Sequence, residues 1–98
     1  MHAEYNITND EKIMHFEIRE GDDIAFLEYR FLKKDIVLMH TEVPESMEGK
    51  GIASALAAHA FKYAKEHAMP VVVYCPFVLT YMKRHPEVRE QLDAAFHQ

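Results

Sequence analysis

The chain has 98 residues, of which 49% are hydrophobic and one is a cysteine, and its formal net charge is −5. This length suits one compact domain spanning residues 1–98, and the lone Cys75 excludes an internal disulfide. The acidic balance, with no basic cluster, argues against a nucleic-acid partner. Neither a bilayer-length apolar run nor a leader-like N-terminus is present, so we expect a soluble, cytoplasmic protein without a membrane partner.

The first half of the chain predicts an antiparallel strand meander. Apolar residues alternate with polar ones from Met14 to Ile18, and Gly21-Asp22-Asp23 supplies a turn. Alternation resumes over residues 25–31. The run Ile36–Val43 predicts a further strand, apolar on both faces at its start, as a central strand covered from two sides would be.

The second half changes to helical periodicity. Apolar residues recur at three- and four-residue spacing from Gly51 to about His67, and Pro70 ends this predicted helix. Residues 71–74 form one short β-branched strand, so the strand–helix–strand order predicts a parallel crossover with residues 36–43. The segment Pro86–His97 predicts a terminal amphipathic helix. The fold class is therefore α/β (α+β), a meander followed by a crossover, with a mixed sheet and flanking helices.

A glycine loop joins the strand ending at Val43 to the long helix. Backbone N–H groups at such a junction lack helical partners, and the helix dipole adds positive charge, so the loop suits an anion such as a pyrophosphate. A P-loop would place Pro44 at its first glycine and Gly51 at its hydroxyl position, which excludes that motif. A Rossmann fingerprint starting at Gly49 would need Ser54 as its last small residue and fits poorly.

The loop Glu48-Gly49-Lys50-Gly51-Ile52-Ala53 resembles the [QR]-x-x-G-x-[GA] loop of the GNAT superfamily of N-acetyltransferases. Together with the motifs HTEVP (40–44), CPF (75–77) and YMKRHP (81–86), it makes residues 35–90 similar to the short, single-domain YjdJ-type branch. The resemblance implies a GNAT-like fold, acetyl-CoA as cosubstrate, no metal, and acetyl transfer to a primary amine of a small molecule or a protein.

The same resemblance implies which residues hold acetyl-CoA. The loop amides would bind its pyrophosphate, and strand backbone would bind its pantetheine arm. The implied cofactor-binding residues are Thr41, Val43, Glu48, Gly49, Lys50, Gly51, Ile52, Ala53 and Ser54. Glu48 departs from the usual Gln or Arg, so this acidic side chain must point away from the pyrophosphate, or the site must bind something less charged.

Cys75 and Tyr81 are the catalytic candidates. Pro76 suits the first position of a helix, which places Cys75 at the N-cap, where its thiol would face free amides and be reactive. The resemblance implies a catalytic role for the matching cysteine, and for Tyr81 as a general acid toward the CoA thiolate. Structural alternatives stay open for both: a small buried hydrophobe for Cys75, and core filler in a stripe with Phe77, Val78 and Met82 for Tyr81.

Three further hypotheses concern a proton relay, the route of acetyl transfer and the function itself. His40 and Glu42 share one face of a predicted strand and could relay a proton; the structural alternative is one satisfied polar residue and one solvated residue. The closest histidines, His59 and His67, are eight residues apart and form no local metal-ligand pair. The usual superfamily reaction is direct attack by the amine, and a covalent acetyl-Cys75 route is its rival. A chain this short lacks the helical insertion that encloses an acceptor, so a CoA-binding or interaction module without turnover is the alternative function.

Overall fold

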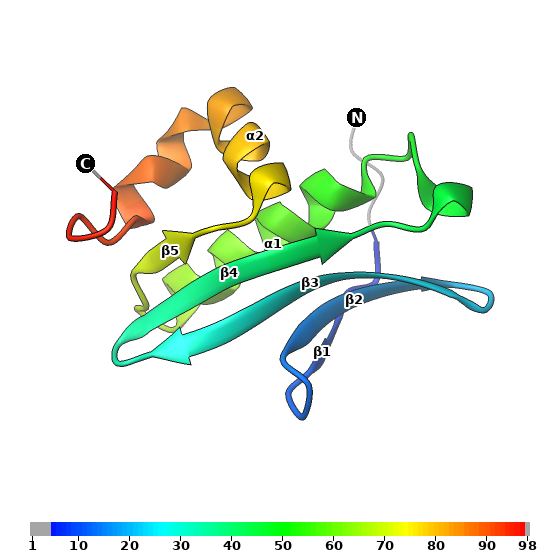
Figure 1. The fold of residues 1–98 in the computed structure, drawn as a ribbon, viewed down its shortest axis with the longest axis horizontal. Coiled ribbons are helices and arrows are strands. Elements are labelled where there is room, and N and C mark those ends of the chain that lie inside the picture. The colour runs from blue at the N-terminus through cyan, green and yellow to red at the C-terminus, as the bar shows by residue number, and fades with distance from the viewer. Residues whose placement is uncertain (1–4, 98) are drawn as a thin grey trace.

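The computed structural model describes residues 5–97 and contains a five-stranded mixed sheet with strand order β1-β2-β3-β4-β5 (Figure 1). Strands β1 (Thr8–Asp10), β2 (His15–Glu20), β3 (Asp23–Leu32) and β4 (Asp35–Glu42) pair antiparallel, and β5 (Val71–Val73) pairs parallel to β4. The helical segments are η1 (Glu45–Met47), α1 (Ile52–Glu66), α2 (Pro76–Arg84) and η2 (Pro86–Gln91). The predicted meander and parallel crossover are confirmed.

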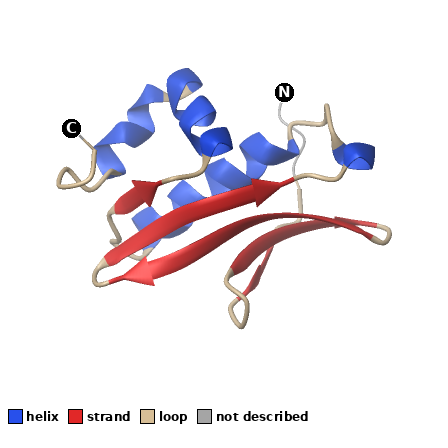
Figure 2. Cartoon of the chain, in the orientation of Figure 1, coloured by secondary structure: helices blue, strands red, loops and turns tan. Residues whose placement is uncertain are grey.

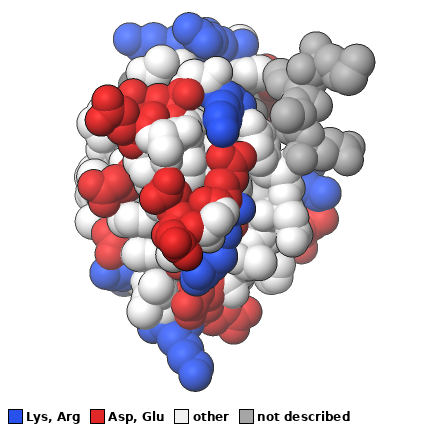
Figure 3. Space-filling view, turned by 90° about the vertical axis from the view of Figure 1, so that its right-hand side faces the viewer, with Lys and Arg blue, Asp and Glu red and all other residues white. Residues whose placement is uncertain are grey.

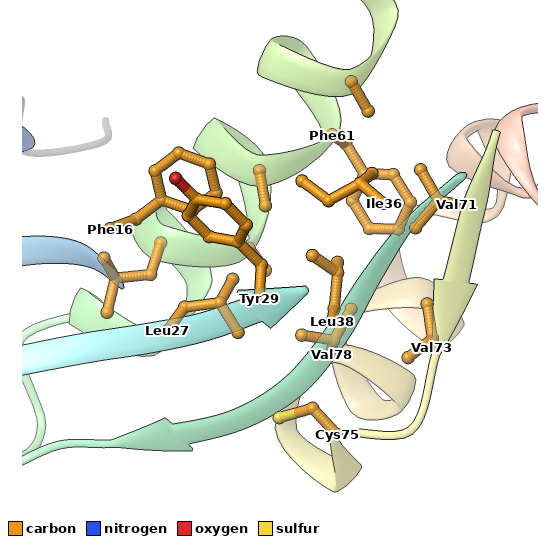
Figure 4. Packing of buried hydrophobic residues seen from close by; sticks show 14 of the residues in the cluster. Phe16, Leu27, Tyr29, Ile36, Leu38, Phe61, Val71, Val73, Cys75 and Val78 are labelled. Atoms are coloured by element: carbon orange, nitrogen blue, oxygen red, sulfur yellow. The ribbon is translucent and has the colours of Figure 1, made fainter. Parts of the chain in front are cut away.

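The core lies on one side of the sheet, where α1, α2 and η2 pack against one another (Figure 2). Phe16, Leu27 and Leu38 project from the strands toward Phe61 and Val78 on the helices (Figure 4). Two-sided coverage of the strand at 36–39 is confirmed only in part. Ile36, Val37 and Leu38 are buried, but Met39 is 38% exposed. Helix α2, which follows β5, packs against α1, so among residues 5–97 no helix covers the other face of the sheet.

The N-terminal strands differ in detail from the prediction. The short strand β1 was not predicted, because its sequence Thr8-Asn9-Asp10 is polar and shows no apolar alternation. Met14 lies before β2 rather than in it, with φ 56°. Its carbonyl accepts a hydrogen bond of 2.9 Å from the Tyr29 N–H, so Met14 ends the β1–β2 turn and fixes the register against β3.

The predicted C-terminal helix over residues 86–97 is wrong. Only Pro86–Gln91 is helical, as a 3₁₀ segment. Leu92 then forms a parallel bridge with Val71, and the Asp93 N–H donates to the Val71 carbonyl at 2.9 Å. The ring Nε2 of His97 accepts the Val73 N–H at 2.9 Å. These contacts satisfy the outer edge of β5, which a continuing helix could not do.

A charged cluster fastens this C-terminal segment to the start of β4. Lys34 Nζ lies 3.3 Å from Asp35 Oδ1 and 3.2 Å from Asp93 Oδ2. Hydrogen bonds from Asp35, the Ala95 N–H and Lys34 lower the pKa of Asp93 to about 2. Burial, followed by the hydrogen bond with Asp93, raises the pKa of Asp35. A proton is therefore held more readily by Asp35 than by Asp93.

Replacing Asp93 with Asn should destabilise the protein in a pH-dependent way. Because the folded-state pKa of Asp93 lies below its unfolded value, its carboxylate stabilises the fold above about pH 4, and this contribution is lost as the pH falls toward about 2. Urea unfolding should show a higher free energy of unfolding for the wild type at about pH 5 and a vanishing difference near about pH 2. Glu90→Gln, an exposed change on η2, is the control; a pH-independent difference would contradict the prediction.

Candidate functional site

The glycine loop connects β4 to α1 and contains two glycines with left-handed backbone conformation. Gly49 has φ 78° and Gly51 has φ 73°, a region that side chains with a Cβ rarely adopt. Gly51 is the N-cap of α1, and its carbonyl accepts the Ala55 N–H at 3.0 Å. Within the described chain, no side chain caps this helix and its first turn holds no acidic residue. The amides of residues 52–54 are therefore available to an anion.

Three contacts hold this loop against the sheet. The Tyr5 hydroxyl donates to the Lys50 carbonyl, and the Ser46 hydroxyl donates to the Asp23 carboxylate. Lys50 Nζ lies 2.9 Å from Glu20 Oε1 on β2, and this hydrogen bond raises the pKa of Lys50. The Lys50 ammonium is therefore engaged by the β2 carboxylate, which leaves its backbone as the part available to a ligand.

A pocket of about 210 Å³ opens at this junction. Its lining comes from the end of β4, η1, the glycine loop, the first turn of α1 and one residue of α2: Val43, Met47, Glu48, Gly49, Gly51, Ile52, Ala53, Ser54 and Phe77. Seven of the nine predicted cofactor-binding residues line it, whereas Thr41 and Lys50 lie outside the lining. Met47 and Phe77 were not among the predicted site residues. Phe77 could have been noticed from its position just after Cys75-Pro76 at a strand end.

Beside the pocket, β4 and β5 separate. Their pairing ends at Leu38 and Val73, where the Leu38 carbonyl accepts the N–H groups of both Tyr74 (2.9 Å) and Cys75 (3.2 Å). Beyond this point β4 continues to Glu42, whereas the segment after β5 turns into α2. One edge of β4 is therefore no longer covered by β5.

A bulge determines which backbone groups face the uncovered edge. Tyr29 pairs with Leu38, but Glu28 pairs with His40, so Met39 is the extra residue. The Tyr29 N–H donates to Met14, on the side of β3 that faces β2. The N–H and C=O of the preceding residue Glu28 therefore point to the other side, toward His40 on β4. Thr41, next along β4, must then direct its N–H and C=O away from β3, toward the side vacated by β5. This geometry suits the predicted role of the Thr41 backbone, which stays a prediction.

Cys75 occupies the N-cap of α2, as predicted, with φ −74° and ψ 122°. The expectation that its thiol faces the helix amides is wrong. The side chain makes no capping hydrogen bond, is fully buried in the core cluster, and lies with Sγ 3.0 Å from Thr41 Oγ1. Figure 4 shows the sulfur directed toward β4. The Met39 bulge places Thr41 opposite the core residue Leu27, which brings its hydroxyl to the thiol.

Tyr81 is packed between aromatic neighbours on α2 and α1. Its ring stacks on His85 with centroids 4.3 Å apart and lies 6.1 Å from the ring of Phe61. Burial, with a smaller effect from Glu87, raises the pKa of the Tyr81 phenol. Tyr81 lies six residues beyond Cys75, which is about 9 Å along the helix axis. This packing is what the core-filler alternative predicts, and the general-acid role stays a prediction.

His40 and Glu42 point from the face of β4 opposite to Thr41. His40 Nε2 lies 4.0 Å from Glu42 Oε2, and both side chains are more than half exposed. Among residues 5–97, no group of three or more His, Cys, Asp or Glu side chains could hold a metal ion. No helix in the described part of the chain combines the length and apolarity needed to cross a membrane.

Carboxylates gather around the end of the molecule that carries the site (Figure 3). They come from the β2–β3 turn, the end of β4 and the η1 segment: Glu20, Asp22, Asp23, Glu42, Glu45 and Glu48. Glu48 is itself exposed and lines the pocket. The loop amides therefore attract an anion within a surrounding field that attracts cations.

The sequence profile described as GCN5-related N-acetyl-transferase matches residues 15–92, from β2 to the bridge at Leu92. The chain belongs to this N-acetyltransferase family. Protein NATD1 of Gallus gallus is 35% identical over 83 residues, covering 82% of this chain and 76% of that protein. Protein NATD1 of Homo sapiens is 34% identical over 83 residues, covering 82% and 74%, respectively. The family match includes the whole glycine loop and α2, while membership of the YjdJ-type branch stays a prediction.

Burial of Cys75 predicts slow alkylation in the folded protein. Iodoacetamide should modify the thiol at least about 100-fold more slowly in buffer than in denaturing urea, because modification requires the β4–α2 contact to open. Intact mass spectrometry over time measures both rates, and the unfolded chain is the internal reference. Similar rates in the two conditions would mean that the native thiol is accessible.

Proposed function

We propose that this family member binds acetyl-CoA in the pocket and transfers the acetyl group to a primary amine. The observation that carries the proposal is the coincidence of two features at the end of β4. One is the first turn of α1, which has no side-chain cap and follows two glycines with left-handed backbone conformation. The other is the β4 edge left open where β5 ends.

Three parts of the cosubstrate would have matching groups in the chain. The amides of residues 49–54 would hold the pyrophosphate. The backbone of Thr41 and Val43 would hydrogen-bond the amides of the pantetheine arm along the open edge. The separation of β4 from β5, next to Cys75, would receive the thioester end. Glu48 is the one lining residue whose charge opposes this fit.

The acceptor amine attacks as the neutral nitrogen and would form a C–N bond with the thioester carbonyl carbon. The C–S bond then breaks, the nitrogen gives up one proton to solvent, and the CoA thiolate takes one up. Cys75 and Tyr81 remain the proposed proton donors. Both are packed in or against the core, so binding and orientation are the contributions that the site supports most directly. The covalent alternative would form and then cleave an acetyl thioester on Cys75.

The acceptor is best matched by a cationic amine in its resting state. The carboxylates around the pocket would concentrate such an amine near the site. The connection between β1 and β2 comprises only residues 11–14, so within the described chain no helix inserted between these strands encloses the acceptor side. A lysine side chain or a chain N-terminus on a protein could therefore approach as readily as a small amine.

A CoA-binding protein without turnover is the second candidate. The burial of Cys75 and the stacking of Tyr81 favour it, because neither side chain lines the pocket. An assay with acetyl-CoA and a panel of amines separates the two functions. Acetylated product formed above the uncatalysed rate supports the transferase, whereas tight CoA binding without product supports the binding module.

Filling the pocket at Gly51 should strongly weaken CoA binding. Asn tolerates the left-handed conformation, so Gly51→Asn adds a side chain beside the amides with little backbone strain, whereas Gly51→Val adds strain of about 1–3 kcal/mol. Calorimetry should show at least a tenfold loss of affinity, about 1.4 kcal/mol, for both variants. Gly21→Asn, at φ 60° outside the pocket lining, is the matched control. Unchanged affinity in Gly51→Asn would move the site elsewhere.

Removing the charge of Glu48 should strengthen CoA binding. Glu48→Gln takes away the repulsion between an exposed carboxylate and the pyrophosphate, which is worth up to about 1 kcal/mol, or a factor of about 2–5 in affinity. The gain should shrink at high salt. Glu45→Gln, on η1 but outside the pocket lining, should change affinity less. Weaker binding by Glu48→Gln would show that this side chain assists the ligand instead.

A further inference from the structure

We infer that Phe77 contacts the ligand and holds the pantetheine arm of CoA against the apolar wall of the pocket. This inference rests on the proposed function and adds a residue to it. Phe77 is 55% exposed and is the residue of α2 that lines the pocket. Phe77 thus contributes to the pocket from α2, whereas the other lining residues lie between positions 43 and 54.

Phe77 does not take part in the packing of α2 against the core. The buried face of this helix consists of Val78 and Met82, with Tyr81 half-buried against Phe61. Phe77 precedes Val78 and therefore points about 100° away around the helix. It is absent from the core cluster of the described residues. A single exposed aromatic is ordinary on a protein surface, but this one lines a pocket beside a predicted anion site.

The pocket combines two kinds of surface. The glycine loop and the first turn of α1 present backbone amides, while Val43, Met47, Ile52 and Phe77 present apolar side chains. A ligand that fits both needs an anionic group joined to an apolar segment. CoA has this form, because the pantetheine arm begins with a dimethyl-substituted carbon next to the pyrophosphate.

Chain order indicates which side of the pyrophosphate Phe77 meets. Phe77 follows Cys75 by two residues, and Cys75 lies where β4 and β5 separate. The arm must run from the loop amides toward this separation to place the thioester there. Phe77 flanks that path, whereas the adenine extends from the other end of the pyrophosphate. The ring therefore determines affinity for the arm rather than for the nucleotide.

The test compares ligands that carry the pantetheine arm, CoA and dephospho-CoA, with ADP, which lacks it. Dephospho-CoA and ADP share the adenosine and the pyrophosphate, but only dephospho-CoA carries pantetheine. Calorimetry with Phe77→Ala should show about a tenfold or larger loss of affinity for CoA and dephospho-CoA, and no change for ADP. Phe77→Leu should recover part of the loss. Leu79→Ala, an apolar residue of α2 that is 40% exposed and outside the pocket lining, should bind all three ligands like the wild type.

Other outcomes overturn the inference in distinguishable ways. Equal losses for dephospho-CoA and ADP would assign Phe77 to the nucleotide, and unchanged affinity for every ligand would remove it from the site. Failure of the wild type to bind CoA would reject the proposed function itself. Since Phe77 is largely exposed, Phe77→Ala should keep the wild-type melting temperature within a few degrees, which excludes unfolding as the cause of any loss.

Discussion

The early end of the β4–β5 ladder is the constraint on which the rest of the site depends. The Leu38 carbonyl accepts two N–H groups, and the next residue after Cys75 is Pro76, which has no N–H to continue the pairing. The chain must leave the sheet at this point, and the proline fits the first turn of a helix. The bulge at Met39 then turns the Thr41 backbone toward the vacated side. An open strand edge, a helix start and the glycine loop therefore meet in one place.

The site also shows a compromise between stability and ligand binding. Helix α1 begins at a glycine rather than at Ser, Asn or Asp, which sacrifices only a few tenths of a kcal/mol of capping energy. In exchange, the first-turn amides stay unoccupied. The surrounding carboxylates repel the proposed anionic cosubstrate, acetyl-CoA, and attract the proposed cationic amine acceptor. Local amide dipoles act at hydrogen-bond distance, whereas the carboxylate field is longer in range and weakened by salt.

Most of the fold could be predicted because its signals are local. Alternation identifies β2 and β3, and the Gly49–Gly51 loop and Pro70 delimit α1. The environment of Cys75 could not be predicted, because it depends on Thr41, 34 residues away, and on a bulge without a sequence signature. The C-terminal segment has helical spacing, yet pairing of Leu92 with a distant strand outweighs that preference. The spacing of Phe77 places it in an apolar stripe, and its position in the pocket lining depends on how α2 lies beside the glycine loop.

The cap on the outer edge of β5 has a consequence for how the protein is handled. A three-residue edge strand with free N–H and C=O groups is a template for strand addition between molecules. Here Asp93 and the ring of His97 occupy two of those groups. Removal of residues 93–97 would therefore uncover this edge and promote self-association. Residues 93–97 therefore belong inside any expressed fragment of this protein.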